Sequence, residues 1–136
     1  KEGSCIFVWG TNPYAGRYPT AMIRAKTLNS ELITQDSYVI LLTHTPDYVE
    51  DTDVSGVDLA LAGHTHGGQV SLFGLYTPVK NTQYGKRFLR GMNKTTSGAS
   101  VITTNGVGTS RRKVRFCVPS EIVFVTLKNL FKCVVR

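Results

Sequence analysis

The sequence predicts an α/β domain, and three observations support this class. Short apolar runs of strand length, such as residues 38–43 and 57–62, are separated by turn-forming residues and by one stretch of roughly helical spacing. The centre of residues 38–43 is continuously apolar, which is typical of a strand covered on both faces. Both runs end just before a histidine, and open α/β sheets bind their ligands at the carboxyl ends of strands.

The predicted elements follow one another without a visible domain boundary before about residue 127. Residues 20–32 are expected to form a helix, and Pro46 and Asp47 suit the first turn of a short one. Residues 69–73 are expected to be extended, and residues 76–91 to form a basic, aromatic loop. Strands are predicted at residues 5–9, 38–43, 57–62, 100–104 and 122–127.

Composition and charge describe a globular chain that favours anionic partners. Of its 136 residues, 41% are hydrophobic and 18% are charged, which excludes a disordered chain. No apolar run approaches the ~20 residues of a membrane-spanning helix, and the start shows no signal-peptide pattern. A cytoplasmic and a membrane-associated location both stay open. The net charge of +7 favours phosphate esters, nucleic acids or acidic membranes without choosing among them.

The three cysteines suggest neither a zinc ribbon nor a disulfide framework. Cys5, Cys117 and Cys133 are far apart in the sequence and form no C-x-x-C pair. Cys5 and Cys117 have apolar neighbours, so we interpret them as small, reduced core residues.

The histidines are the strongest functional signal in the chain. His44 follows one predicted strand, and His64 and His66 follow the next in a loop rich in glycine, residues 63–68. A lone histidine at a strand end is more often a surface or packing residue, but three such positions together favour metal binding, for which imidazole is a common ligand. The glycines are expected to let the loop turn sharply, so that the rings approach one point or serve one ion each.

Several segments resemble motifs of the calcineurin-like metallophosphoesterases. Residues 40–47 are similar to the fourth motif of that family, and residues 58–69 to its final Gly-His-x-His motif, with a Gly-Gly-Gln ending typical of one bacterial branch. Residues 103–110, 114–116 and 119–122 resemble the closing segment of that branch. The resemblance runs from about Ile6 to Leu127. It implies the C-terminal half of a four-layer α+β sandwich, in which two mixed sheets pack together with helices outside.

The resemblance also implies an enzyme that hydrolyses a phosphate monoester, a phosphodiester or a pyrophosphate at two divalent metal ions. His44 and His64 would bind one ion and His66 the other, so that all three act in catalysis through the metal. The ions would be manganese, iron or zinc. Together they would polarise the phosphoryl group and lower the pKa of a bridging water that attacks phosphorus in line.

Basic residues near the closing segment are the candidate substrate-binding groups. Arg111 and Arg112, with Lys113, are expected to help hold an anionic substrate, although a solvated loop is at least as good an interpretation. Arg115 is expected to pair with a carboxylate. The substrate class implied is a phosphorylated small molecule or lipid. Residues 128–136 form a basic, amphipathic tail that is compatible with a membrane surface, and also with a frayed terminus.

Three motifs that the family resemblance calls for are missing from the chain. It contains no Asp-x-His, no Gly-Asp and no Gly-Asn-His. Three imidazoles supply no bridging carboxylate and none of the negative charge that two divalent ions attract. We therefore expect a fragment, residues 1–127 being the C-terminal part of the domain, that is inactive alone. A non-catalytic relative that keeps the fold for interactions is the alternative.

A nucleic-acid-binding module is a second alternative, of a different class. Its support is a set of aromatic and basic residues, which could form a surface for stacked bases and phosphates. No recognised binding motif accompanies them, so nucleic acid is not expected as a partner. The residues are Tyr76, Tyr84, Phe88, Lys80, Lys86, Arg87 and Arg90.

Overall fold

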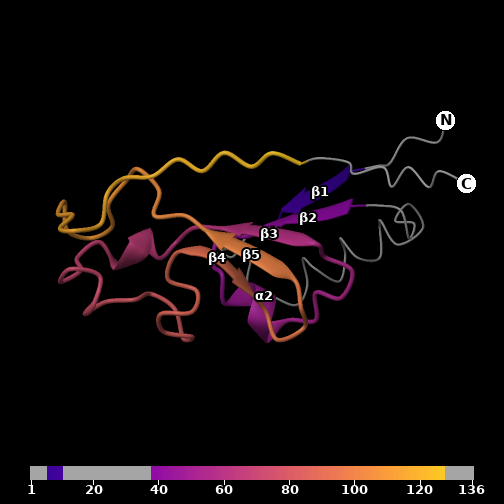
Figure 1. Cartoon of the computed structure of the whole chain (residues 1–136), viewed down its shortest axis with the longest axis horizontal. Helices are drawn as coiled ribbons and strands as arrows, with labels where there is room; N and C mark the ends of the chain where they lie inside the picture. Colours follow the sequence, from indigo (N-terminus) through magenta and orange to yellow (C-terminus); the bar gives the residue numbers. More distant parts are fainter. Residues whose placement is uncertain (1–5, 11–37, 128–136) are drawn as a thin grey trace, which may run out of the picture.

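A single mixed sheet is the main element of the computed structural model, which describes residues 6–10 and 38–127 (Figure 1). Four of its strands are parallel neighbours, and the fifth pairs antiparallel at one edge. Helix α2 (Tyr48–Asp51) and the 3-10 turn η1 (His66–Gly68) are the short helical elements of this part. In spatial order the strands are β1 (Ile6–Gly10), β2 (Tyr38–Leu42), β3 (Leu59–Ala62), β5 (Ser100–Thr103) and β4 (Gly91–Lys94).

The central strands β2 and β3 are covered on both faces, as their continuous apolar sequences predict. Residues 39–41 of β2 are buried, and so are Leu59, Ala60 and Ala62 of β3. The two strands pair in parallel, with Leu42 opposite Leu61. Their carboxyl ends therefore lie side by side at one end of the sheet.

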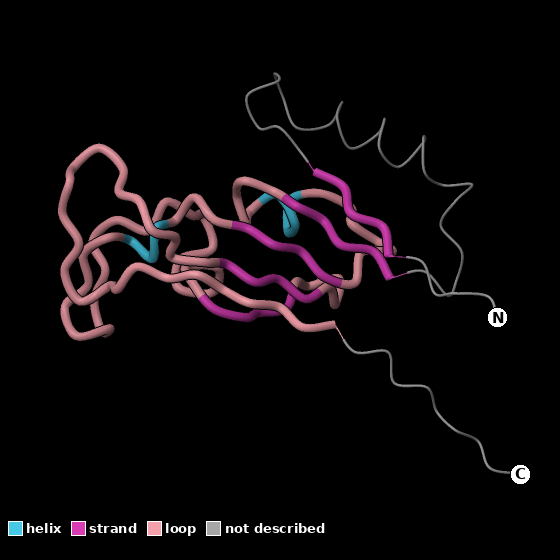
Figure 2. Tube along the Cα trace, turned by 90° about the horizontal axis from the view of Figure 1, so that it is seen from above, coloured by secondary structure: helices cyan, strands magenta, loops and turns pink. Residues whose placement is uncertain are grey.

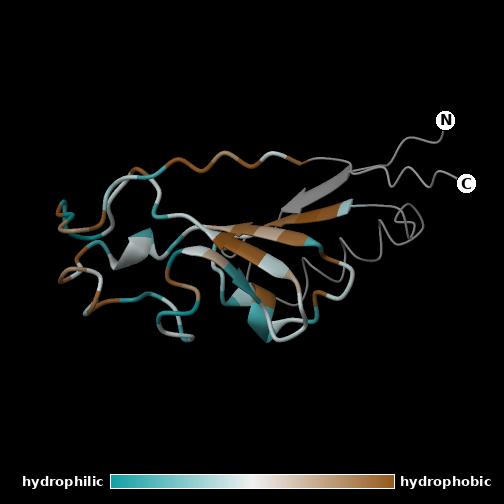
Figure 3. Ribbon diagram, in the orientation of Figure 1, coloured by the Kyte–Doolittle hydropathy of each residue, from teal (hydrophilic) through white to brown (hydrophobic). Residues whose placement is uncertain are grey.

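The two faces of the sheet are covered differently. One face packs against α2, Tyr84 and the buried Phe88, which form the core with the inward residues of β2, β3 and β5. The extended residues 121–127 run along the other side of the sheet (Figure 1), where they and the strands line a shallow apolar hollow. Figure 3 shows hydrophobic residues both in the strands and in this extended segment.

The loops gather at one end of the sheet. Figure 2 shows η1 and the long connecting loops beyond the strand ends. Because β2, β3 and β5 all run toward this end, their following residues meet there. Any site built from strand-end residues is confined to this region.

Most of the predicted elements are confirmed, with ends that differ by one or two residues. The strands predicted at residues 5–9, 38–43, 57–62 and 100–104 correspond to β1, β2, β3 and β5. The predicted short helix is α2, and Asp47 is its N-cap. The predicted helix at residues 20–32 and the tail at residues 128–136 lie outside the described residues.

Other predictions are wrong. Residues 122–127 form no strand, because they pair with no described strand and leave Phe124 91% and Ile122 71% exposed. The extended segment predicted at residues 69–73 is confirmed only at Val70 and Leu72, which form isolated β-bridges, and is wrong at Gln69 and Phe73, whose φ values are 57° and 51°. Cys117 is exposed rather than buried in the core.

The remaining differences concern the sheet as a whole. The edge strand β4 was not predicted, because its sequence, Gly-Met-Asn-Lys, lacks apolar alternation and exposes Met92. The described residues form one sheet, so a second packed sheet stays an expectation from the resemblance. None of the helices in the described ranges is long and apolar enough to cross a membrane.

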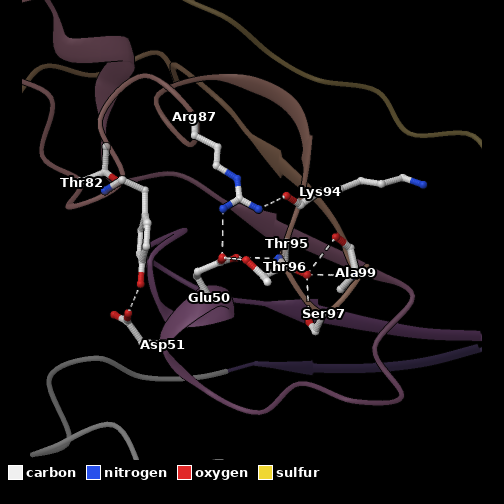
Figure 4. Close-up of polar contacts among 10 residues, drawn as sticks. Glu50, Asp51, Thr82, Arg87, Lys94, Thr95, Thr96, Ser97 and Ala99 are labelled. Carbon is white, nitrogen blue, oxygen red and sulfur yellow. Dashed lines mark hydrogen bonds and ion pairs between the residues drawn. The ribbon is translucent and has the colours of Figure 1, made fainter.

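Glu50 ties α2 to the loops before and after β4 (Figure 4). Its carboxylate accepts hydrogen bonds from the Arg87 guanidinium at 2.9 Å, from the Thr96 N–H at 3.1 Å and from the Thr96 hydroxyl. Arg87 also donates to the Lys94 carbonyl at 2.6 Å, and its guanidinium lies 4.8 Å from the centre of the Phe88 ring. One carboxylate thus holds three segments of the chain together.

The same contacts weigh against a surface for nucleic acid. Phe88 is fully buried, so it offers no face for a stacked base. Tyr84 donates its hydroxyl to Asp51, and this hydrogen bond raises the pKa of Tyr84 to about 12. Arg87 is paired with Glu50. Of the three aromatic residues, Tyr76 alone is well exposed.

We expect Glu50→Gln to lower the free energy of unfolding by roughly 1–3 kcal/mol at pH 7, because it weakens hydrogen bonds made to a charged group. Burial by itself raises the pKa of Glu50, but the hydrogen bonds from Thr96 and Arg87 outweigh it, so the folded pKa lies below 4.5. The contribution is therefore complete above pH 4.5 and is lost as the pH falls through the folded pKa.

The measurement is urea denaturation of both proteins across the acid range. Glu50→Gln should flatten the loss of stability toward low pH. Identical pH profiles for the wild type and Glu50→Gln would contradict this account.

Candidate metal centre

The ends of β2 and β3 bring His44 and His64 together. The parallel pairing continues past the strands, because the Thr43 N–H donates to the Leu61 carbonyl at 3.0 Å and the Gly63 N–H to the His44 carbonyl at 3.2 Å. Both histidines therefore leave the sheet at the same edge. The structure confirms their predicted positions beyond two neighbouring strands.

The two imidazole rings face each other. Nδ1 of His64 lies 2.9 Å from Nε2 of His44, and the ring centroids are 4.7 Å apart. Without an ion, one ring nitrogen donates and the other accepts. Two nitrogen ligands of a tetrahedral zinc, each at ~2.0–2.1 Å, lie about 3.3 Å apart. A small rotation of the rings would thus admit an ion, and this pair fits as two ligands of one metal.

The surroundings of His64 favour its neutral form. Burial lowers the pKa of His64, the nearby His44 and His66 lower it further, and Asp47 opposes them in part. A ligating imidazole must be unprotonated, so a lowered pKa favours metal binding at neutral pH. Asp47 itself is engaged elsewhere, because its carboxylate accepts hydrogen bonds from Thr82 and from the Gln83 N–H.

His66 is held separately from this pair. Its Nδ1 lies 3.2 Å from the Gly108 carbonyl, which fits an Nδ1–H donor and leaves Nε2 unprotonated. Metal-binding histidines usually donate their second nitrogen to such a group. Among the described residues no cluster of three His, Cys, Asp or Glu side chains converges as a metal site. The structure thus joins His44 with His64 and leaves His66 apart.

Residues 63–68, the histidine loop, contain unusual backbone conformations. His64 and His66 take positive φ values of 66° and 51°, as do Gly67 at 60° and Gly68 at 81°. A non-glycine residue there costs about 1–3 kcal/mol, and such residues cluster at functional sites. Gly63 does not take a positive φ and has open space around it. The sharp turn expected of the glycines therefore depends on Gly67, Gly68 and the histidines themselves.

Gly67 and Gly68 are also required by close packing. A Cβ on Gly67 would lie 2.3 Å from Oδ1 of Asn105, which is buried. A Cβ on Gly68 would lie 2.1 Å from the Thr77 side chain and 2.6 Å from the Val79 carbonyl oxygen. The loop thus passes where no side chain fits.

Two polar side chains that fix this loop were given no role by the sequence. Thr65 is fully buried between the two histidines, and its hydroxyl donates to the Leu89 carbonyl at 2.7 Å and accepts from the Gly67 N–H. The Gln69 amide donates to the Ser110 carbonyl at 2.9 Å and accepts from the Ser110 N–H. The signal available was their place inside the Gly-His-Thr-His-Gly-Gly-Gln motif.

The basic residues divide into two groups. The prediction that Arg115 pairs with a carboxylate is wrong for the part of the chain that the structure describes. Arg115 donates instead to the backbone carbonyls of His66, Asn105, Gly106 and Gly108.

Arg111 and Arg112 are exposed, and they line a hollow of about 270 Å³ beside Gly68 and Gln69. The hollow adjoins the histidine loop. An anion bound there would lie near that loop.

Comparison with known proteins identifies relatives over about two thirds of the chain. A Bacillus subtilis protein named as an uncharacterized metallophosphoesterase, YkuE, is 40% identical over 92 residues, which are 68% of this chain and 32% of that protein. A metallophosphoesterase of Aquifex aeolicus is 37% identical over 92 residues, 68% and 33% of the two chains. One of Helicobacter pylori is 35% identical over 89 residues, 65% and 23%.

The chain is therefore a relative of the bacterial metallophosphoesterases, and the resemblance seen in its motifs is confirmed. It spans about a third of the length of the first two of these curated relatives. No family model matches the chain, and no solved structure matches it.

We expect Gly68→Ala to lower the free energy of unfolding by more than about 1 kcal/mol, because an alanine at positive φ is strained and its Cβ meets the Val79 carbonyl. Gly63→Ala, five residues before Gly68 and with open space around its backbone, is the matched control and should change stability little. Chemical denaturation followed by circular dichroism measures both. Equal effects of the two substitutions would show that the loop lacks this conformation.

Proposed function

We propose that this chain is part of a metal-dependent phosphoesterase, which hydrolyses a phosphate monoester, a phosphodiester or a pyrophosphate at a dinuclear centre. The observation that carries the proposal is the 2.9 Å approach of the His64 and His44 ring nitrogens beyond two parallel strands. The names of the relatives support the same reaction class.

The histidines have distinct roles in this proposal. His44, through Nε2, and His64, through Nδ1, would hold one ion. His66 would hold the second ion through Nε2, since its Nδ1 faces the Gly108 carbonyl. Bound manganese, iron or zinc ions supply the charge that polarises the phosphoryl group and the low pKa of an attacking water. The chain's own residues supply the ligand geometry, and burial with the neighbouring histidines favours the neutral form of His64.

The set of neutral donor atoms indicates which further ligands the metal centre requires. The imidazoles are neutral ligands, and no carboxylate joins His44 and His64 within the described residues. Two divalent ions and a phosphoryl group would require negative ligands as well. We therefore propose that further ligands come from other parts of the full-length protein, and that this segment alone is inactive.

The substrate side of the site is proposed to lie toward Arg111 and Arg112. Their hollow also contains Val70, Val79 and Val114, so it combines guanidinium groups with apolar side chains. This combination fits a phosphate ester that carries an apolar group, whether a small molecule or a lipid. Association of residues 128–136 with a membrane surface stays part of the same proposal.

We expect His44→Ala, His64→Ala and His66→Ala each to reduce metal-dependent hydrolysis of an aryl phosphodiester by more than about 100-fold, since even loss of an outer partner of a ligand costs 10–100-fold. His66→Ala should lose a different ion from the other two variants. The assay uses the full-length protein with manganese, and elemental analysis counts the bound ions.

Cys117→Ser is the control, because an exposed thiol is another metal-binding group and its removal should change nothing. A full-length protein that binds no metal and hydrolyses nothing would contradict the proposal and favour the non-catalytic relative. Turnover that persists in the histidine variants would place the centre elsewhere.

The double variant Arg111→Gln/Arg112→Gln should raise KM about tenfold and leave kcat unchanged, because lost uniform binding of an anion appears in KM. Lys94→Gln, at an exposed lysine on β4, removes one charge away from the hollow and serves as the control. Steady-state kinetics of the full-length protein measure both constants. An unchanged KM in the double variant would show that Arg111 and Arg112 belong to a solvated loop and do not bind substrate.

A further inference from the structure

Four backbone carbonyls converge on the guanidinium of Arg115. Nη2 donates to the carbonyls of Asn105 at 2.8 Å, Gly106 at 3.1 Å and Gly108, and Nη1 lies 3.4 Å from the carbonyl of His66. Carbonyl oxygens that point toward one another repel, and the positive charge and N–H donors of the guanidinium offset this repulsion. Arg115 thus joins the segment after β5 to the histidine loop.

Two of these carbonyls belong to the environment of one histidine. The Gly108 carbonyl accepts from Arg115 and also lies 3.2 Å from Nδ1 of His66, which is possible because a carbonyl has two lone pairs. The carbonyl of His66 itself accepts from Arg115 and from the Gln69 N–H at 3.0 Å. The arginine therefore fixes His66 through both its side chain and its backbone.

The rest of the segment is held by other groups. The Glu121 carboxylate accepts from the Asn105 N–H at 2.9 Å and from the Thr104 hydroxyl, and the Glu121 N–H donates to the Gly106 carbonyl at 3.0 Å. Gln69 holds Ser110. Loss of Arg115 should therefore release the Gly108 carbonyl without detaching the whole segment.

We propose that Arg115 is a positioning residue for His66. By holding the Gly108 carbonyl in place, it keeps the proton of His66 on Nδ1 and leaves Nε2 as the metal-binding atom. This inference rests on the proposed function for its purpose, but the tautomer it predicts is a property of the metal-free protein. Without Arg115, the Gly108 carbonyl is no longer fixed and the proton of His66 redistributes between Nδ1 and Nε2.

The test is ¹⁵N NMR of the imidazole nitrogens in the metal-free, full-length protein, with the His66 signals assigned through His66→Gln. The wild type should show a single Nδ1–H tautomer at His66. Arg115→Met should shift His66 toward the Nε2–H tautomer and weaken zinc binding about 10–100-fold, the usual effect of losing an outer partner. Lys94→Met removes a long, positively charged side chain from an exposed position on the edge strand. It should change neither the tautomer of His66 nor the affinity for zinc.

Arg115→Lys is the second variant, and it also serves if Arg115→Met does not fold. A lysine keeps the charge but lacks the planar set of donors, so it should give an intermediate tautomer ratio. A folded variant at position 115 with an unchanged His66 tautomer would overturn the inference. Failure of zinc to shift the His66 signals in the wild type would instead overturn the proposed function, and the tautomer result would still decide the role of Arg115.

Discussion

The parallel pairing of β2 with β3 is the constraint on which the rest of the structure depends. Its register sets Leu42 against Leu61, and hydrogen bonds continue the pairing as far as His44 and Gly63. A shift of one residue would reverse the side chains of a strand between the two faces of the sheet. Val39 and Leu41 lie in the core on one face of β2, whereas Leu42 on the other face is 41% exposed, and this difference fixes the register and with it the position of His44 relative to His64.

A second layer of constraint comes from the loops that meet at this end of the sheet. The histidine loop can adopt positive φ values at His64 and His66 because the surrounding packing holds it. Thr65 binds it to the core through Leu89, and Gly68 lets it pass beside Val79. Backbone carbonyl and N–H groups take part in most of the hydrogen bonds that hold this loop. The side chains of His44 and His64 face each other, and that of His66 faces the Gly108 carbonyl.

The sequence predicted the sheet strands and the histidine pair because both depend on local patterns. Apolar runs predicted β2 and β3, and the histidines within two residues after each run predicted the site. It could not place Arg115, since four carbonyl partners depend on how the segment after β5 folds back over the histidine loop. It misjudged residues 122–127, because an apolar, β-branched run predicts a strand whether or not a pairing partner is at hand.

The charge of the site determines which ligands and substrates it can bind. The described residues bring two imidazoles together with guanidinium groups nearby, and no carboxylate among them completes the site. Such a set can attract an anionic substrate, but it holds divalent ions only in concert with negative ligands. That requirement agrees with a chain that spans about a third of its first two curated relatives.

The most direct test of the central claim is anomalous X-ray scattering at the manganese edge, from crystals of the full-length protein grown with manganese. The account predicts an anomalous peak within ligand distance of both Nε2 of His44 and Nδ1 of His64, and a second peak beside Nε2 of His66. A fully loaded crystal whose anomalous peaks lie away from His44 and His64 would contradict it.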